Sequence, residues 1–239
     1  AQGLNQPARV LGLHFFSPAH IMKLLEIVVP AGVSDAALAG AVAFGKRLRK
    51  VSVLAGVCDG FIANRIMSAY RRECEFMLED GALPWQIDAA MVDFGLPMGI
   101  FQMQDMAGLD ISWAMRKRQA ATRDPAQRYV QIADKICEMG RFGQKTGRGW
   151  YIYDGKTRTP DPEVEALIIA ESQRKGIGRK PFDDTQIMGR IVSRMQSEGR
   201  AILDEGIAAR AEDIDVVMVN AYGFPRWRGG PMFMARETP

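Results

Sequence analysis

Arg9-Val-Leu-Gly-Leu-His-Phe-Phe16 and Met22-Lys-Leu-Leu-Glu-Ile-Val-Val29 are two short apolar segments that predict neighbouring strands. Ser17-Pro18 closes the first segment and Pro30 follows the second, as turn residues do at strand ends. The short connection between the segments is compatible with a hairpin. This stretch therefore predicts a strand-rich beginning for a chain whose later part is helical.

The next residues extend this strand-rich piece. Residues 34–49 predict a helix with Ser34 as its N-cap. Residues 50–54 predict a third strand, which ends near Gly56. Three strands and one helix rarely form a self-sufficient α/β sheet, so we expect this piece to depend on further structure.

The chain becomes helical after Asp59, which we interpret as an N-cap. The helix that follows is expected to run to Asp80 and to stop at Gly81, a residue typical of helix ends. Further helical segments are predicted from Pro84, from Asp105 onward and over residues 126–139.

The helical part contains an internal repeat, and residues 157–162 between the two halves have the composition of a linker. The repeat distance of 125 to 128 residues is far too long for a solenoid, so two copies of one helical domain is the simplest interpretation. The matched positions are Arg65-Ile66 with Arg190-Ile191, Glu73 with Glu198, Gly81 with Gly206, and Phe94-Gly-Leu-Pro97 with Tyr222-Gly-Phe-Pro225.

Composition excludes several classes of protein. Hydrophobic residues make up 47% of the 239 residues and charged residues 25%, which excludes a disordered chain. The net charge of +3 comes from mixed charges without a basic block, so nucleic acid is not the expected partner. No apolar run reaches a membrane span, and the first residues do not resemble a signal peptide. Three cysteines without a C-x-x-C spacing and only two histidines predict no metal site and no disulfide framework.

His14 is the first candidate for chemistry. If the two strands pair as a hairpin centred on His20, His14 and Glu26 become cross-strand neighbours with Cβ atoms about 4.5–5.5 Å apart. A carboxylate at that distance would fix the imidazole tautomer and stabilise the imidazolium. The alternative interpretation is a histidine that merely hydrogen-bonds to a structural glutamate.

Asn64 is the second candidate, because an asparagine inside a helix has below-average helix propensity. The second copy has Gly189 at the matching position, while Arg190 and Ile191 are retained. The helical scaffold therefore does not require asparagine here, which favours a functional role. A surface or capping asparagine remains the alternative.

Two glycine-containing segments are further candidates. Phe142-Gly-Gln-Lys-Thr-Gly-Arg-Gly-Trp-Tyr151 predicts a loop in which Lys145 meets an anionic group, or else a plain exposed hairpin. The segment that begins at Tyr222 and ends at Pro231 either faces a phosphorylated ligand or closes the helical pair. The chain contains no G-x-G-x-x-G fingerprint for a dinucleotide.

Four ordered motifs give the whole chain a resemblance to a known family. The segment Gly12 to Glu26 resembles the catalytic segment of L-3-hydroxyacyl-CoA dehydrogenases. Asp59-Gly-Phe-Ile-Ala-Asn-Arg65, Phe142-Gly-Gln-Lys-Thr-Gly147, and Tyr222-Gly-Phe-Pro225 with Arg228-Gly-Gly-Pro231 are also similar to motifs of that family.

The resemblance implies a fold and a set of roles. In this family a Rossmann domain binds NAD, and a helical domain completes the substrate cleft. His14 matches the catalytic histidine and Glu26 its carboxylate partner. Asn64 matches the substrate-binding asparagine, and Tyr222 falls in a motif near the substrate. The positions that match NAD contacts are Ser17 and Lys145.

The resemblance also implies an organisation for the chain. We expect a mainly α protein in which residues 1–57 are a remnant of the Rossmann-type α/β sheet. Residues 58–156 and 157–239 are then two copies of the all-α C-terminal domain. The duplication points to the multifunctional branch of fatty-acid β-oxidation, in which a hydratase/isomerase domain precedes the dehydrogenase.

Partners and location follow from the same branch. The implied partners are an acyl-CoA substrate, the upstream Rossmann and hydratase domains, and a second copy of the chain or a thiolase. The expected location is the bacterial cytoplasm first, or the peroxisome if the source is eukaryotic.

The sequence departs from the family in ways that bear on activity. The glycine fingerprint and the catalytic serine of the family lie upstream of the histidine strand, and this chain has neither. We therefore expect Ala1 to be a cut end and the chain to be inactive on its own. Ile100, where the family commonly has proline, and Gly189 are smaller departures. The alternatives are a non-catalytic helical assembly or acyl-CoA-binding module, and a related hydroxyacid dehydrogenase.

Overall fold

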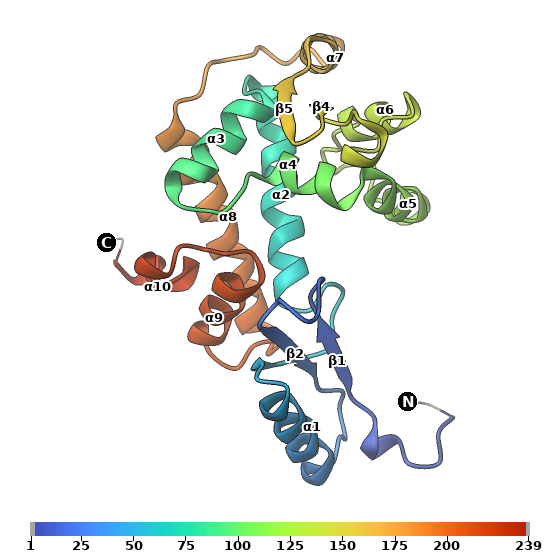
Figure 1. Ribbon diagram of the computed structural model, residues 1–239, viewed down its shortest axis with the longest axis vertical. Coiled ribbons are helices and arrows are strands. Elements are labelled where there is room, and N and C mark those ends of the chain that lie inside the picture. The colour runs from blue at the N-terminus through green and yellow to red at the C-terminus, as the bar shows by residue number, and fades with distance from the viewer. Residues whose placement is uncertain (1–2, 238–239) are drawn as a thin grey trace. The chain divides into compact units, whose positions relative to one another are not determined.

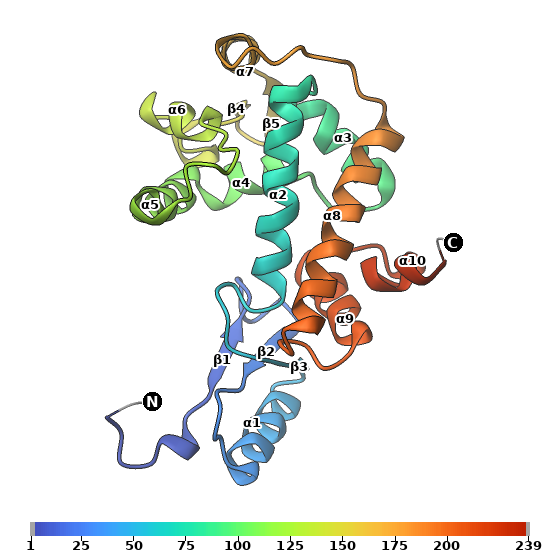
Figure 2. The ribbon, with the colours of Figure 1, turned by 180° about the vertical axis from the view of Figure 1, so that it is seen from behind.

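The computed structural model describes residues 3–237, and Ala1, expected to be a cut end, lies outside this range. The described chain is rich in helices and has two small sheets (Figures 1 and 2). It divides into two compact units. The first unit consists of the segments up to Tyr70 and from Val192 onward, and the second unit runs from Arg71 to Ile191. These units combine parts of different predicted domains, so the predicted domain boundaries stay predictions.

The first unit contains the predicted three-stranded sheet. Its strands are β1 (Gly12–Phe15), β2 (Leu24–Val28) and β3 (Val51–Ala55). Strand β2 pairs antiparallel with β1 and parallel with β3. All five residues of β2 are buried, as expected for a central strand. The hairpin register is centred as predicted and places His14 opposite Glu26.

Helix α1 (Asp35–Arg47) connects β2 to β3, and the short 3-10 helix η1 (Pro7–Arg9) precedes β1. Ser34 caps α1 as predicted, because its hydroxyl accepts the N–H of Ala37 at 3.3 Å. The buried side chains of Leu25, Ile27 and Ala41 form the core between the sheet and this helix.

Helix α2 (Ala63–Asp80) contributes its first eight residues to this unit. The prediction that Asp59 caps this helix is wrong. Gly60 and Phe61 have positive φ angles of 80° and 48°, so the chain turns once more before the helix begins. The first helical N–H groups are bound by the side chain of Glu26, which comes from β2. The prediction that the helix ends at Asp80 is confirmed.

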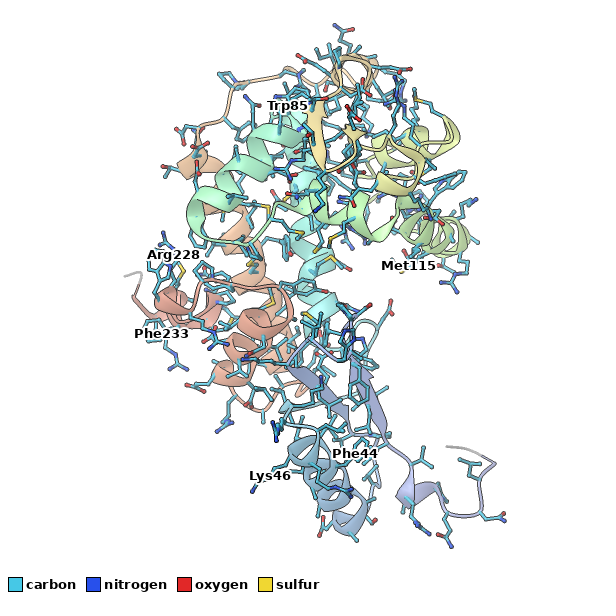
Figure 3. All side chains as sticks on the ribbon, in the orientation of Figure 1. Phe44, Lys46, Trp85, Met115, Arg228 and Phe233 are labelled. Atoms are coloured by element: carbon cyan, nitrogen blue, oxygen red, sulfur yellow. The ribbon has the colours of Figure 1, made fainter. Side chains whose placement is uncertain are left out.

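The rest of the first unit is helical. It contains the later part of α8 (Asp184–Asp204), then α9 (Ala211–Ala221), η4 (Arg226–Arg228) and α10 (Pro231–Glu237). Helix α9 packs against β3. Phe44 on α1 and Phe233 on α10 are exposed apolar side chains of this unit (Figure 3).

The second unit is built mainly from short helices. They are α3 (Pro84–Phe94), α4 (Ile100–Ala107), α5 (Leu109–Gln119), η2 (Ala120–Thr122), α6 (Ile132–Glu138), η3 (Gln144–Thr146) and α7 (Pro162–Arg174). The helical segment predicted from Asp105 begins earlier, at Ile100. The helix predicted over 126–139 begins only at Ile132, because residues 124–127 form a turn in which the carboxylate of Asp124 accepts the N–H of Ala126.

The predicted linker at residues 157–162 is also wrong. Strand β5 (Thr157–Pro160) pairs antiparallel with β4 (Tyr151–Asp154), and α7 follows at once with Asp161 as its N-cap. Threonine favours strands, and a proline is tolerated at the end of a two-stranded sheet because its missing N–H need not pair. Residues 157–160 are therefore an edge strand, although their composition is typical of a linker.

Two buried aspartates brace the starts of short helices in the same way. In the second unit, Asp88 on α3 accepts the N–H groups of Phe101 and Gln102 at the start of α4. In the first unit, Asp215 on α9 accepts the N–H groups of Met232 and Phe233 at the start of α10. A Cβ atom at Gly99 or Gly230 would lie within 2.3 Å of the respective aspartate, so glycine is required at both places.

A second arrangement that occurs in both units is an arginine bound to two carboxylates. In the first unit Arg65 binds Glu198 and Glu205, and in the second unit Arg190 binds Glu73 and Asp80. None of the helices formed by residues 3–237 is long and apolar enough to cross a membrane.

Candidate active site

The predicted histidine–carboxylate pair is present in the first unit. Nδ1 of His14 lies 2.6 Å from Oε2 of Glu26, as their opposite positions on β1 and β2 require. The Glu26 side chain is fully buried, whereas the His14 side chain is 26% exposed. The carboxylate therefore holds one ring nitrogen from inside the protein, while the ring keeps a face accessible from outside.

Glu26 is also tied to the start of α2. Its Oε1 accepts the N–H groups of Ile62 at 3.1 Å and Ala63 at 2.9 Å. A buried carboxylate needs such partners, because an unpaired charge in the interior is costly. With both oxygens occupied, Glu26 has one orientation, and it can receive only a donated N–H from Nδ1 of His14. This arrangement favours the tautomer whose other nitrogen, Nε2, is unprotonated.

Nε2 of His14 has no hydrogen-bond partner among residues 3–237, and aromatic rings surround the imidazole. The ring centroids of Phe16 and Phe61 lie 4.6 Å and 5.4 Å from that of His14. Phe16 is buried at the end of β1, and its ring meets the ring of Tyr222 edge-on at 6.4 Å. The imidazole thus stands in an apolar surrounding with one free nitrogen, an arrangement suited to accepting a proton from a bound molecule.

Asn64 and Tyr222 come together in the same unit. Asn64 is the second residue of α2, directly after Ala63, and Tyr222 follows the last residue of α9. The Tyr222 hydroxyl donates to Oδ1 of Asn64 at 2.6 Å. This bond fixes the side-chain amide and leaves its Nδ2 group as a donor for a ligand.

The two residues expected to contact NAD lie in different units. Ser17 is exposed and comes just after β1. Lys145 lies in η3 of the second unit, where its half-exposed ammonium pairs with Asp110. That hydrogen bond and the positive charge of Lys145 lower the pKa of Asp110. The structure thus gives Lys145 a partner that its position in a glycine-rich loop did not predict.

Two functional features of this site were not predicted from the sequence. One is the aromatic surrounding formed by Phe16 and Phe61. The other is the second role of Glu26 as the partner of the first N–H groups of α2. The motif that contains Phe61 was the available signal, because Phe61 lies three residues before Asn64. Within residues 3–237, no three His, Cys, Asp or Glu side chains gather as a metal site.

A histidine held by a buried carboxylate, with its other ring nitrogen unpaired among residues 3–237, is an arrangement that enzymes use for general-base catalysis. Residues 1–58 match the family model described as the 3-hydroxyacyl-CoA dehydrogenase NAD binding domain, and residues 60–153 match the model of its C-terminal domain. The chain belongs to the 3-hydroxyacyl-CoA dehydrogenase family, as its motifs indicated.

A curated relative and two solved structures extend this result. The peroxisomal bifunctional enzyme of Danio rerio is 47% identical over 97% of this chain, which spans about a third of that protein's length, 34%. The 3-hydroxybutyryl-CoA dehydrogenase of Escherichia coli has the same fold, with a TM-score of 0.78 at 22% identity, over 99% of this chain and 65% of that one. The dehydrogenase part of multifunctional enzyme 1 from C. elegans matches with a TM-score of 0.68 at 27% identity, over 93% of this chain and 50% of that one.

The relative from Danio rerio bears on location. It is a peroxisomal protein of a eukaryote, and its name describes a bifunctional enzyme. This finding agrees with the second of the two expected locations and does not support the bacterial cytoplasm. It also agrees with the expectation that members of this branch carry more than one domain.

Proposed function

We propose that this chain supplies the general base and the substrate-binding residues of an NAD-dependent 3-hydroxyacyl-CoA dehydrogenase. The reaction is the oxidation of 3-hydroxyacyl-CoA to 3-ketoacyl-CoA in fatty-acid β-oxidation. The observation that carries the proposal is the bond of 2.6 Å between Nδ1 of His14 and the buried carboxylate of Glu26. Family membership supplies the reaction class, and this pair supplies a base with a free nitrogen.

Each residue of the pair has a defined task in the proposed reaction. Nε2 of His14 accepts the proton of the substrate hydroxyl at C3, and the positive charge that develops on the ring is stabilised by Glu26. General-base assistance of this kind is typically worth about 10²- to 10⁴-fold in rate. Because Glu26 is fully buried and bound at both oxygens, the ring need not reorient when it becomes charged.

Asn64 and Tyr222 are proposed to hold the substrate. The amide Nδ2 of Asn64 is free to donate to a carbonyl oxygen of the acyl thioester, since Oδ1 is held by Tyr222. A donor at that oxygen would hold the thioester carbonyl, C1, and so fix the position of the reacting carbon C3. Phe16 contacts both the His14 ring, at a tilt, and the Tyr222 ring, edge-on, which supports a common pocket for these side chains.

NAD, when bound, supplies the hydride acceptor. The exposed Ser17 follows β1 directly and lies three residues after His14, so its hydroxyl fits a contact with a cofactor bound next to the histidine. Lys145 is proposed as a second contact, although it would have to exchange its bond with Asp110. The sequence has no G-x-G-x-x-G turn to hold a pyrophosphate, so we propose that the 239-residue chain alone does not catalyse the reaction.

We further propose that the helical part is duplicated, with domains at 58–156 and 157–239 after a sheet domain at 1–57. The matching aspartate braces at Asp88 and Asp215 support this, since each holds the start of a short helix beside a required glycine. The matching arginine pairs at Arg65 and Arg190 support it as well, because their carboxylate partners also correspond in the repeat.

The wider setting is proposed from the family and the relatives. We propose that the chain works with an NAD-binding Rossmann domain and a hydratase domain of the same protein, in a peroxisome. A second copy or a thiolase is a further proposed partner. These proposals extend the bifunctional character of the curated relative to this chain.

The test is a His14→Ala substitution in the natural protein that contains this sequence. NADH oxidation with acetoacetyl-CoA should fall at least about 100-fold in kcat, with KM nearly unchanged, as loss of a general base predicts. The matched control is His20→Ala, because His20 is the other histidine and is exposed. Near-normal turnover of His14→Ala would refute the role of His14. Acyl-CoA binding without turnover by the unmodified protein would favour the alternative, a non-catalytic acyl-CoA-binding module.

A further inference from the structure

The second unit contains a pocket of about 390 Å³. None of the residues that line it belongs to the candidate active site. Pockets of this size are in the range that holds small molecules. Its walls come from α2, from α5 and from the segment between η2 and α6. Five guanidinium groups line it: Arg71, Arg72, Arg116, Arg123 and Arg128.

Of the two carboxylates that line the pocket, Asp124 is exposed and accepts only the backbone N–H of Ala126, whereas Glu75 is bound to an arginine. Glu75 accepts Nη1 of Arg116 with both of its oxygens, at 3.1 Å and 3.0 Å. Arg128 binds Glu79 and Asp80, which lie outside the pocket lining. Two of the five guanidinium groups are therefore neutralised by carboxylates at hydrogen-bond distance. Of the other three, Arg71 has only a long ion pair with Glu75.

Arg71 is the most informative of the three. Its side chain is only 14% exposed, and its Nε is buried without a hydrogen-bond partner in the described part of the chain. Its nearest carboxylate oxygen, on Glu75, is 3.9 Å from Nε, which is too far for a hydrogen bond. A buried donor without an acceptor is costly, and only the exposed part of this guanidinium can meet a ligand in the pocket.

Arg72 and Arg123 increase the unbalanced positive charge. Among residues 3–237, neither has a carboxylate oxygen within 4 Å. Arg123 instead stacks over the ring of Tyr129 at 3.4 Å and donates to the backbone oxygen of Arg116 at 3.1 Å. These contacts orient the guanidinium without neutralising it.

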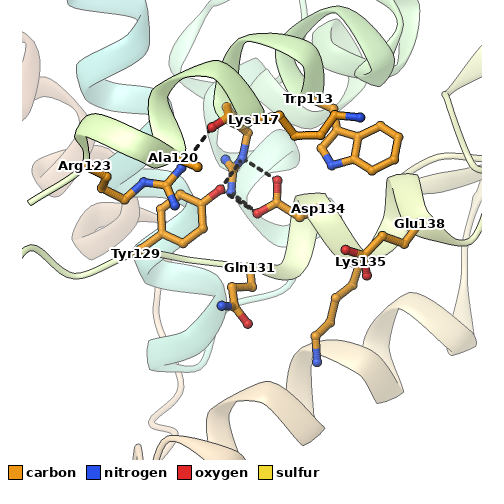
Figure 4. Close-up of a pocket in the computed structure, with 10 residues that line it drawn as sticks. Trp113, Lys117, Ala120, Arg123, Tyr129, Gln131, Asp134, Lys135 and Glu138 are labelled. Carbon is orange, nitrogen blue, oxygen red and sulfur yellow. Dashed lines mark hydrogen bonds and ion pairs between the residues drawn. The ribbon is translucent and has the colours of Figure 1, made fainter. Parts of the chain in front are cut away.

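A neighbouring pocket of about 320 Å³ shares Arg116, Arg123 and Tyr129 with the first one. Figure 4 shows Arg123 beside the Tyr129 ring, with Lys117 and Trp113 on the same pocket. The Lys117 ammonium lies 3.5 Å from the centroid of Trp113. Each of these two aromatic rings therefore has a cation on one face, which brings further positive charge to the rim.

We propose that the arginine pocket binds a phosphate-bearing anion. The planar guanidinium fork matches two phosphate oxygens at once, and several forks around one pocket favour a doubly charged group over a single carboxylate. Arg71, Arg72 and Arg123 have no carboxylate at hydrogen-bond distance among residues 3–237, so their charges are available to such an anion. The phosphate could belong to a nucleotide-like ester or to a free phosphate or diphosphate, and the experiment separates these sources.

The test is titration of the purified 239-residue chain by calorimetry with inorganic phosphate, pyrophosphate and adenosine 3′,5′-bisphosphate, at an ionic strength fixed with sodium chloride. Arg71→Gln and Arg72→Gln should each weaken binding at least about tenfold, since hydrogen bonds to charged groups are worth at least that factor. Arg118→Gln is the matched control, because Arg118 is an exposed arginine of α5 outside the pocket. It should bind like the unmodified chain.

The pattern of affinities identifies the source. Tighter binding of the bisphosphate than of pyrophosphate indicates a nucleotide-like ester, and equal affinities indicate a free phosphate group. Arg72 is exposed, so Arg72→Gln keeps the test meaningful even if Arg71→Gln does not fold. Absence of saturable binding of all three probes would overturn the proposal. An equal loss of affinity in Arg118→Gln would overturn it as well, since that result indicates only general attraction to a basic surface.

Discussion

Substituting Glu26 by glutamine should damage catalysis through the histidine tautomer. In the native site Oε1 of Glu26 accepts two backbone N–H groups at the start of α2, and Oε2 faces Nδ1 of His14. A glutamine has one oxygen and one NH₂ group. The oxygen is expected to stay with the two backbone donors, which places the NH₂ group against Nδ1.

This arrangement reverses the hydrogen bond to His14. Nδ1 must then accept rather than donate, so the ring proton moves to Nε2, the atom that should receive the substrate proton. The expected fall in kcat is roughly 10²- to 10⁴-fold, the range seen when a general base is lost or held in the wrong tautomer. KM should change little, because Glu26 is fully buried and does not reach the substrate.

The assay is steady-state reduction of NAD with 3-hydroxybutyryl-CoA, the direction in which Nε2 must accept a proton, in the natural protein that contains this sequence. Unfolding by urea should show a loss of about 1.5–3 kcal/mol, the value of one hydrogen bond to a charged group. Glu138→Gln is the matched control, because it makes the same change at an exposed position of α6. If Glu26→Gln kept kcat within a few-fold of the unmodified protein, Glu26 would not control the tautomer of His14.

Two other substitutions test separate parts of the structure. Tyr222→Phe removes the hydroxyl that holds Asn64, so KM for the acyl-CoA should rise by up to about tenfold while kcat falls less; an unchanged KM would count against Asn64 as a substrate ligand. Burial raises the pKa of Asp105 to about 6, above 3.8. A carboxyl with a raised folded-state pKa stabilises the protein below pH 4, and this contribution is lost as the pH rises through 6. The free energy of unfolding, measured relative to Asp105→Asn, should therefore fall by about 2.5 kcal/mol between pH 4 and pH 7; a flat difference would show that Asp105 has an ordinary pKa.

The pairing of His14 with Glu26 was predictable from the sequence because a short hairpin fixes its own register. Once the turn is centred on His20, the partner of each strand residue follows by counting, and the structure has that register. The end of α2 at Asp80 was predictable for a similar reason, since Gly81 is a local stop signal.

Structural features that depend on residues far apart in the sequence could not be predicted from local sequence patterns. The start of α2 is set by Glu26, which lies 36 residues before Ile62, and no local pattern near Asp59 records that contact. Strand β5 exists because β4 precedes it, although the sequence of β5 alone resembles a linker. The arginine pocket is lined by residues of α2 and α5 and of a segment without regular structure. No single sequence motif therefore predicts it.

Glu26 links the geometry of the proposed base to that of the proposed substrate ligand. Its Oε2 orients His14, and its Oε1 holds the N–H groups of Ile62 and Ala63, the residues directly before Asn64. Because one rigid carboxylate makes both sets of bonds, the histidine and the first turn of α2 cannot shift independently. Tyr222 then fixes the side chain of Asn64 from the other direction. A disturbance at either end of this chain of contacts should therefore reach both residues, so the position of the base and that of the substrate amide are determined together by the fold of the first unit.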